Sequence, residues 1–144
     1  MAGIILGSAC GRSDPPPAVL DTAHEPCRFC RMVVSDQRFA SQIVAPYEEP
    51  LFFDDLSCLG NFLKQTPELP SGALVYVADH RTRAWVRADR AVYTRVDTLS
   101  APMGSHIVAH GSTASRDADV DAAKGSPVSI SEVFPGGLQK GGSR

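Results

Sequence analysis

The amino-acid sequence predicts an α+β fold of two related strand–strand–helix–strand units, packed as small sheets with helices. Short segments rich in Val, Ile and aromatic residues alternate with two amphipathic segments that begin at a good N-cap residue. A pentapeptide also recurs: Ser-Gln-Ile-Val-Ala at residues 41–45 matches Ser-His-Ile-Val-Ala at 105–109 in four positions. The shared order of elements predicts an internal duplication, with sheets and helices in layers.

The first predicted unit combines one helix with strands on either side. Asp54 or Asp55 can cap the helix, and prolines at positions 67 and 70 end it. Trp85, the only tryptophan, lies in a strand and is expected in the core. The apolar face of the helix carries Leu56, Leu59, Phe62 and Leu63. The strands are expected at residues 31–35, 39–45, 74–78 and 84–87.

The second predicted unit has the same kinds of element. Ser112 or Thr113 can cap an Ala-rich helix that runs to Lys124, with Gly125 at its end. The Asp-x-Asp-x-Asp run at 117–121 lacks the Gly and Glu of a calcium loop, and we interpret it as the acidic face of this helix. Strands are expected at residues 91–96, 105–110 and 127–133.

Length and composition limit the classes of protein. The chain has 144 residues, enough for one compact domain, and ordinary globular composition. Its 14 basic and 16 acidic residues lack the basic excess of a nucleic-acid binder, and no apolar run approaches the ~20 residues of a membrane span. The expected parts are a residual signal at 1–10, a flexible tether at 11–24, a domain at 25–134 with halves 25–87 and 88–134, and a disordered tail at 135–144.

The N-terminus is typical of a bacterial lipoprotein signal that lacks its beginning. An apolar stretch leads to Ser8, Ala9 and Cys10, the order of a lipobox, in which the cysteine is lipidated. Leu6 lies one position further from Cys10 than usual, and no basic residue precedes the stretch. One explanation is a start codon assigned too late; the alternative is a frayed terminus with a chance cysteine. We therefore expect a lipid anchor at Cys10, followed by the Pro-rich tether.

Soft sulfur ligands gather in the segment Cys27-Arg-Phe-Cys30-Arg-Met32. Two thiols separated by two residues can converge on one atom, which leaves four interpretations: a zinc knuckle, a redox dithiol, a structural disulfide or a Cu(I) site. A second Cys-x-x-Cys is missing, which weighs against closed zinc coordination. Met32 favours Cu(I), because thioether and thiolate sulfur prefer soft ions.

Other candidate ligands lie far along the chain. Met103 lies in a turn between Pro102 and Gly104, where it either fills a gap or faces the cysteine segment. His106 and His110 share one side of the next predicted strand and can offer imidazole nitrogen. We expect a tether position for His24, a solvent-facing turn position for His80, and the role of a small buried hydrophobe for Cys58.

Five short motifs follow one another along the chain: Cys27-Arg-Phe-Cys30-Arg-Met32, Phe52-Phe53-Asp54-Asp55-Leu-Ser-Cys58-Leu, Tyr76-Val-Ala-Asp79 with Trp85-Val86, Ala91-Val-Tyr93 and Ala101-Pro102-Met103-Gly104. With these motifs in this order, the chain resembles the NosL family, copper-binding accessory lipoproteins of nitrous oxide reductase maturation. The resemblance covers about residues 25–134 and departs from the family pattern at Arg31, where Gly is usual, and at His110, where an aromatic residue is usual.

The resemblance implies a periplasmic, membrane-tethered Cu(I) carrier that passes copper to nitrous oxide reductase or another cuproenzyme. It also implies two strand–strand–helix–strand units similar to the organomercurial lyase core. The expected copper ligands are Cys27, Cys30, Met32 and Met103, with His106 or His110 as optional nitrogen ligands. Without metal, Cys27 and Cys30 can form a disulfide that blocks loading until it is reduced.

We expect a copper carrier and not an enzyme. Two other interpretations of the sequence remain open. An organomercurial lyase-like enzyme needs thiols beside a carboxylate, which Asp54 or Asp55 can supply only if the fold brings it to the cysteines. A metal-free lipoprotein needs only a disulfide that stabilises its fold.

Overall fold

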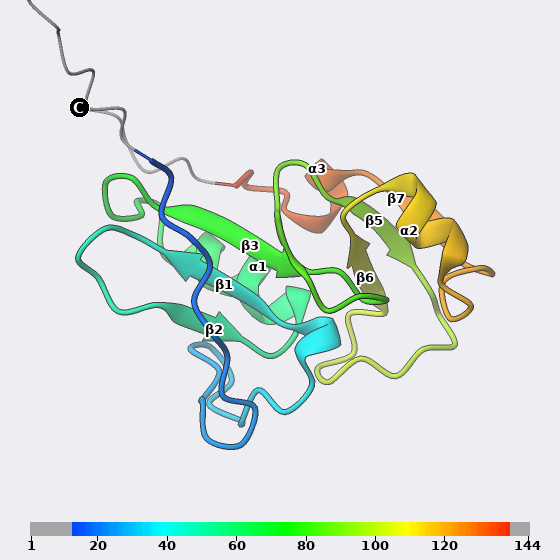
Figure 1. Ribbon diagram of the computed structural model, residues 1–144, viewed down its shortest axis with the longest axis horizontal. Helices are drawn as coiled ribbons and strands as arrows, with labels where there is room; N and C mark the ends of the chain where they lie inside the picture. The colour runs from blue at the N-terminus through cyan, green and yellow to red at the C-terminus, as the bar shows by residue number, and fades with distance from the viewer. Residues whose placement is uncertain (1–12, 139–144) are drawn as a thin grey trace, which may run out of the picture.

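The computed structural model of the chain describes residues 13–138, which form two antiparallel sheets side by side (Figure 1). The first sheet has the strand order β2–β1–β3–β4 and the second the order β6–β5–β7. The strands are β1 (Ser41–Val44), β2 (Leu51–Phe53), β3 (Leu74–Ala78), β4 (Trp85–Arg87), β5 (Val92–Arg95), β6 (Ile107–His110) and β7 (Ser126–Val128). The helices are η1 (Gln37–Phe39), α1 (Leu56–Gln65), α2 (Thr113–Ala118) and α3 (Ile130–Val133).

The two sheets repeat one topology, and the predicted α+β class is confirmed. In each, the first strand along the chain lies between the second and the third and runs antiparallel to both; α1 and α2 connect the second strand to the third. The recurring pentapeptide nevertheless aligns β1 with β6, whose equivalent in the first sheet is β2. The repeat therefore lies in the topology, and the short sequence match does not mark equivalent strands.

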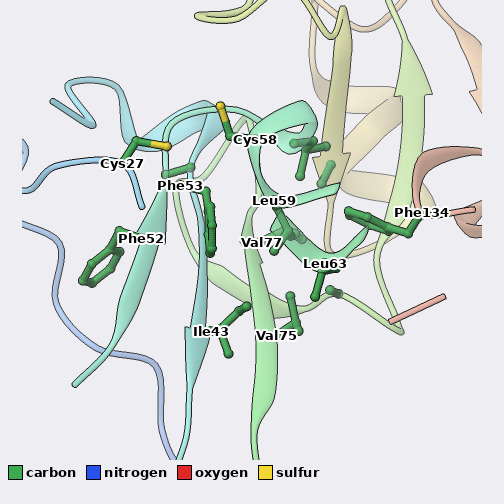
Figure 2. Packing of buried hydrophobic residues seen from close by; sticks show 14 of the residues in the cluster. Cys27, Ile43, Phe52, Phe53, Cys58, Leu59, Leu63, Val75, Val77 and Phe134 are labelled. Carbon is green, nitrogen blue, oxygen red and sulfur yellow. The ribbon is translucent and has the colours of Figure 1, made fainter. Parts of the chain in front are cut away.

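Helix α1 covers one face of the first sheet and forms the main core with it. Asp55 caps the helix, as predicted, because its side chain accepts a hydrogen bond from the Ser57 amide. Leu59 and Leu63 point from α1 toward Val75 and Val77 of β3 (Figure 2). Burying each leucine contributes roughly 2–3 kcal/mol. This packing fixes the first turn of α1 against the end of β2.

The second unit departs from the predicted boundaries. The helix expected at 113–124 ends at Ala118, because Asp119 leaves the helical conformation and turns its carboxylate into the protein. The strand expected at 127–133 ends at Val128. Ser129 and Glu132 then form a capping box that starts the short helix α3. The side chain of Phe134, directly after α3, packs edge-on against Tyr93 in the core.

The strand expected at residues 31–35 is wrong. Only Val33 pairs there, with Pro26 in an isolated antiparallel bridge, and the segment between them is a turn. Strand β2 was not predicted, because three residues after Pro50 give too short a pattern. The cysteine segment is therefore a loop, and it lies against the end of β2.

Residues 13–20 lie against the first sheet. Gln42 and Ala18 exchange two hydrogen bonds, of 2.8 and 3.1 Å, and the Tyr76 hydroxyl donates to Pro15. In Figure 1 this dark blue segment crosses the face of the sheet opposite α1. The expected tether is therefore held to the domain over these residues. The predicted signal with Cys10, and the predicted tail from 139 onward, lie outside the described residues.

Within residues 13–138, no helix combines the length and the apolar character that crossing a membrane requires.

Candidate metal centre

A loop that is closed at both ends carries Cys27 and Cys30. The Pro26–Val33 bridge closes its ends, and inside it the Cys27 amide donates to the Met32 carbonyl at 2.7 Å. The Arg28 amide donates to the carbonyl of Phe52 in β2 at 2.8 Å, which ties the loop to the first sheet. The loop therefore holds Cys27, which is fully buried, and the half-buried Cys30 beside the end of β2.

Arg31 takes a strained conformation in this loop. Its φ is +68°, in the left-handed region that glycine adopts without steric cost. Its amide donates to the Cys27 carbonyl at 3.0 Å, which closes the turn around the two thiols. A positive φ at this position accounts for the Gly that the motif described above usually has there. In this chain the same turn forms although the residue is Arg.

Cys58 completes a cluster of three thiols. It lies in the first turn of α1, three residues after the cap Asp55, and is 1% exposed. The sulfur atoms of Cys27, Cys30 and Cys58 all lie within 4.8 Å of one another. Figure 2 shows Cys27 and Cys58 together at one end of the core, next to Phe53. We call these three residues the thiol cluster; all three are free cysteines.

The thiol cluster favours a thiolate at Cys27. A hydrogen bond from the Cys58 thiol, supported by the backbone amides of Cys30, Asp54 and Phe29, lowers the pKa of Cys27 well below its usual range although burial opposes this. The same hydrogen bond raises the pKa of Cys58, and burial raises that of Cys30. One thiolate among two thiols is suited to capture a metal ion, because the thiolate is the coordinating form.

Asp55 connects the thiol cluster to the Met103 turn. Its Oδ2 accepts the amides of Met103 at 2.9 Å and Ser105 at 3.1 Å, while its Oδ1 caps α1. Gly104 between them has a φ of +73°, which the turn requires. The Met103 backbone therefore lies at the start of the helix that carries Cys58, and its side chain is 49% exposed.

Asp54 places a buried carboxyl beside the cysteines. Asp54 is only 5% exposed. Its Oδ1 has no hydrogen-bond partner among the described residues. Burial, then the charges of Cys27 and Asp55, raise its pKa to about 6. The fold thus brings together thiols and a carboxyl that holds its proton unusually well.

The predicted nitrogen ligands lie elsewhere. The His106 ring contacts the Leu99 carbonyl at 2.9 Å, and His110 belongs to a separate buried group with Asp119 and His80. His80 is 2% exposed, so its predicted solvent-facing position is wrong: the turn after β3 folds beneath α2. Met32 lies in the loop itself, and its side chain is 63% exposed. The structure therefore joins Cys27 and Cys30 with Cys58; the side chains of Met32 and Met103 are exposed, and their copper ligation stays a prediction.

Comparison with known proteins decides the family. The sequence profile of the NosL family matches residues 18–136. The chain belongs to the NosL family. The crystal structure of the copper chaperone NosL from Shewanella denitrificans is similar in fold, with a TM-score of 0.58 at 19% identity over 77% of this chain and 90% of that chain. Among curated protein sequences, none matches the chain.

Cys58 is the residue of this NosL-family site that sequence reasoning missed. Its place on the apolar edge of a helix predicts a buried residue, which it is. No local signal distinguishes it, because a thiol in the first helical turn, three residues after the cap Asp55, has the same sequence pattern as a small buried hydrophobe. Its approach to Cys27, 31 positions away in the chain, depends on the long-range docking of the loop on β2.

Proposed function

We propose that this NosL-family protein is a Cu(I) metallochaperone of the bacterial cell envelope and not an enzyme. The observation that carries the proposal is the thiol cluster, where three sulfur atoms lie within 4.8 Å of one another and a hydrogen bond from Cys58 lowers the pKa of Cys27. Thiolate sulfur favours Cu(I) over harder ions. The similar fold of a protein described as a copper chaperone adds support.

The position of the thiol cluster suits transfer of its cargo. Cys27 and Cys58 are buried, whereas Cys30 is half-buried, so that one face of a bound ion remains approachable. Met32 and Met103 are exposed on neighbouring segments and offer weaker thioether ligands during loading or release. The chain therefore holds copper mainly through Cys27, Cys30 and Cys58, and an incoming ligand of the acceptor displaces Cys30 first.

The family and the N-terminal sequence support a site of action in the cell envelope. We place the protein in the periplasm, tethered to the membrane through lipidated Cys10, with a cuproenzyme such as nitrous oxide reductase as the acceptor. An oxidising envelope adds a requirement, because any two thiols of the cluster can form a disulfide and an electron donor must then precede copper loading.

Anaerobic Cu(I) titration against a competing chelator tests the proposal. The reduced chain is compared with Cys30→Ser, Cys58→Ser, Met32→Leu and Met103→Leu, with Met1 left unchanged. We expect one tightly held equivalent, weakened most by the two cysteine variants and least by the methionine variants. Failure of the reduced protein to compete for Cu(I) would contradict the proposal and favour a metal-free lipoprotein.

One observation favours a second candidate, an organomercurial lyase-like enzyme. Asp54 donates its backbone amide to Cys27 and carries a protonated carboxyl below about pH 6 beside the thiols. Such an acid can protonate the carbon released when a thiolate binds mercury. Incubation with phenylmercuric acetate separates the candidates: benzene release that Asp54→Asn abolishes supports the lyase, and binding without benzene release supports the carrier.

A further inference from the structure

A second group of ligand-type side chains lies where the two sheets meet. His80 follows β3, His110 ends β6, and Asp119 follows α2 as its C-cap. The His80 amide donates to the Ala109 carbonyl at 2.9 Å, which joins the two sheets at this point. We call His80, His110 and Asp119 the histidine cluster.

The histidine cluster converges on one carboxylate oxygen. His80 Nδ1 and His110 Nε2 each lie 2.7 Å from Asp119 Oδ2, so that both rings face the same atom. The other oxygen, Oδ1, accepts the Asp121 amide at 3.0 Å and holds the carboxylate in this orientation. All three side chains are buried, with exposed fractions of 2%, 0% and 4% for His80, His110 and Asp119.

The two rings of the histidine cluster are held in apolar surroundings, and their outer nitrogens have no partner. His80 Nε2 and His110 Nδ1 are buried without a hydrogen-bond partner among the described residues. The edge of Phe39 packs against the His80 ring, with ring centres 5.2 Å apart, so the surroundings are apolar. A buried polar network with unsatisfied members is less stable than apolar residues of the same size, unless another interaction offsets the cost.

We propose that the histidine cluster is a second metal site, which takes Zn²⁺ through His80 Nδ1, His110 Nε2 and Asp119 Oδ2. Imidazole nitrogen and carboxylate oxygen suit this borderline ion, whereas Cu(I) prefers the sulfur atoms of the thiol cluster. Two neutral imidazoles and one carboxylate carry a single negative charge, which a divalent cation overcompensates. The ligand set is the three-residue set of an open tetrahedral site, with water as a fourth ligand.

The geometry requires only a small expansion. Ligand atoms about 2.0 Å from a tetrahedral Zn²⁺ lie roughly 3.3 Å apart, compared with the 2.7 Å contacts of the hydrogen-bonded cluster. In the bound state the inner nitrogens coordinate the ion, and each ring carries its proton on the outer nitrogen. The ion replaces two hydrogen bonds by three coordinate bonds and ties β3, β6 and α2 together. This role is independent of copper transfer.

Histidine-ring NMR of the reduced 144-residue chain tests the site. Two-bond ¹H–¹⁵N spectra report the proton position and metal ligation of each ring, including those of His24 and His106. Two equivalents of Zn²⁺ are added, so that ions taken up by the thiol cluster do not deplete the second site. Because the site is buried, Zn²⁺ is supplied both to the folded protein and during refolding.

We expect His80 Nδ1 and His110 Nε2 to acquire metal-bound shifts and the remaining nitrogens to carry the protons. Asp119→Asn, which keeps the size of the side chain, should weaken this response about a hundredfold, and His110→Gln should abolish it at His80. The control His24→Gln alters an exposed ring paired with Asp21 and should leave the response unchanged. Circular dichroism verifies that each variant folds.

Two results overturn the proposal. One is the absence of any shift at His80 and His110 in folded, Zn²⁺-saturated protein, which leaves a hydrogen-bonded triad only. The other is a shift that persists unchanged in both Asp119→Asn and His110→Gln. Loss of Cu(I) binding in the titration described above leaves this test unaffected, because its readout is confined to the histidine rings.

Discussion

The thiol cluster and the histidine cluster differ in softness, burial and origin. Three sulfur atoms from a loop and the start of α1 form the first, and its Cys30 remains half-buried. Two imidazoles and a carboxylate from both sheets form the second, in which no residue is more than 4% exposed. An approachable soft site suits an ion that must be passed on, whereas an enclosed site suits an ion that stays. Position in the fold therefore separates exchange from retention.

The largest effect is expected from Asp55→Ala, because Asp55 supports the thiol cluster on two sides. The substitution removes the cap of α1 and leaves the Met103 and Ser105 amides without their acceptor. We expect the free energy of unfolding to fall by about 4 kcal/mol, measured by urea denaturation. Ser112→Ala, which removes only the cap of α2, should cost about 1 kcal/mol. Equal losses in the two variants would show that Asp55 acts as a cap alone.

Cys27→Ser should separate the two clusters. Cys27 is the thiolate of its cluster, and serine keeps the size of the side chain without a soft donor. We expect Cu(I) affinity to fall about a hundredfold, or about 3 kcal/mol, measured by competition with a Cu(I) chelator. The Zn²⁺ response of the histidine rings should not change. A variant that loses both responses while folded would contradict independent sites.

Asp54→Asn tests the buried carboxyl beside the thiols. Burial raises the pKa of Asp54 from 3.8 to about 6, so the native state binds the proton more tightly than the unfolded chain does. Stability is therefore greatest below the unfolded pKa and is lost as pH rises through about 6. The metal-free, reduced variant should be more stable than the wild type by about 2 kcal/mol at pH 7.5, with no difference near pH 3.5.

Urea denaturation at the two pH values measures this change. Asp97→Asn, at an exposed position, is the matched control and should have no effect at either pH. A gain for Asp54→Asn that is the same at both pH values would mean that the carboxylate charge is not its cause.

The smallest effect is expected from Arg31→Gly in the cysteine loop. Glycine adopts the φ of +68° without steric cost, so the variant should be more stable by about 0.5–1 kcal/mol. Arg28→Gly, in the same loop but without a positive φ, should be destabilised by a similar amount. Thermal unfolding of the reduced protein measures both, and stabilisation of Arg28→Gly would refute the strain at Arg31.

Local chemistry predicted the helix starts well. The side chains of Asp55 and Ser112 cap α1 and α2 as the sequence indicates, because capping depends on atoms only two or three residues apart. The capping box from Ser129 to Glu132 is also a local signal, and the strand predicted at 127–133 wrongly runs through it. The end of α2 was not readable, because the distant His80 and His110 draw Asp119 out of the helix.

The two clusters show where sequence reasoning ends. The pairing of Cys27 with Cys30 follows from their spacing, but the approach of Cys58 requires the loop to dock on β2 through Arg28. A polar turn correctly predicted the location of His80 between two strands and wrongly predicted its exposure. Contacts between segments far apart in the chain depend on how the sheets meet, which no local pattern contains.

Copper X-ray absorption of the protein loaded with one equivalent of Cu(I) tests the central claim most directly. The account predicts a first shell of sulfur alone, in which Cys27, Cys30 and Cys58 all take part. Cys58→Ser should then lose one sulfur scatterer, whereas His106→Gln should leave the spectrum unchanged. A first shell that is identical in Cys58→Ser and the wild type, or one dominated by nitrogen, would contradict the three-thiol copper site.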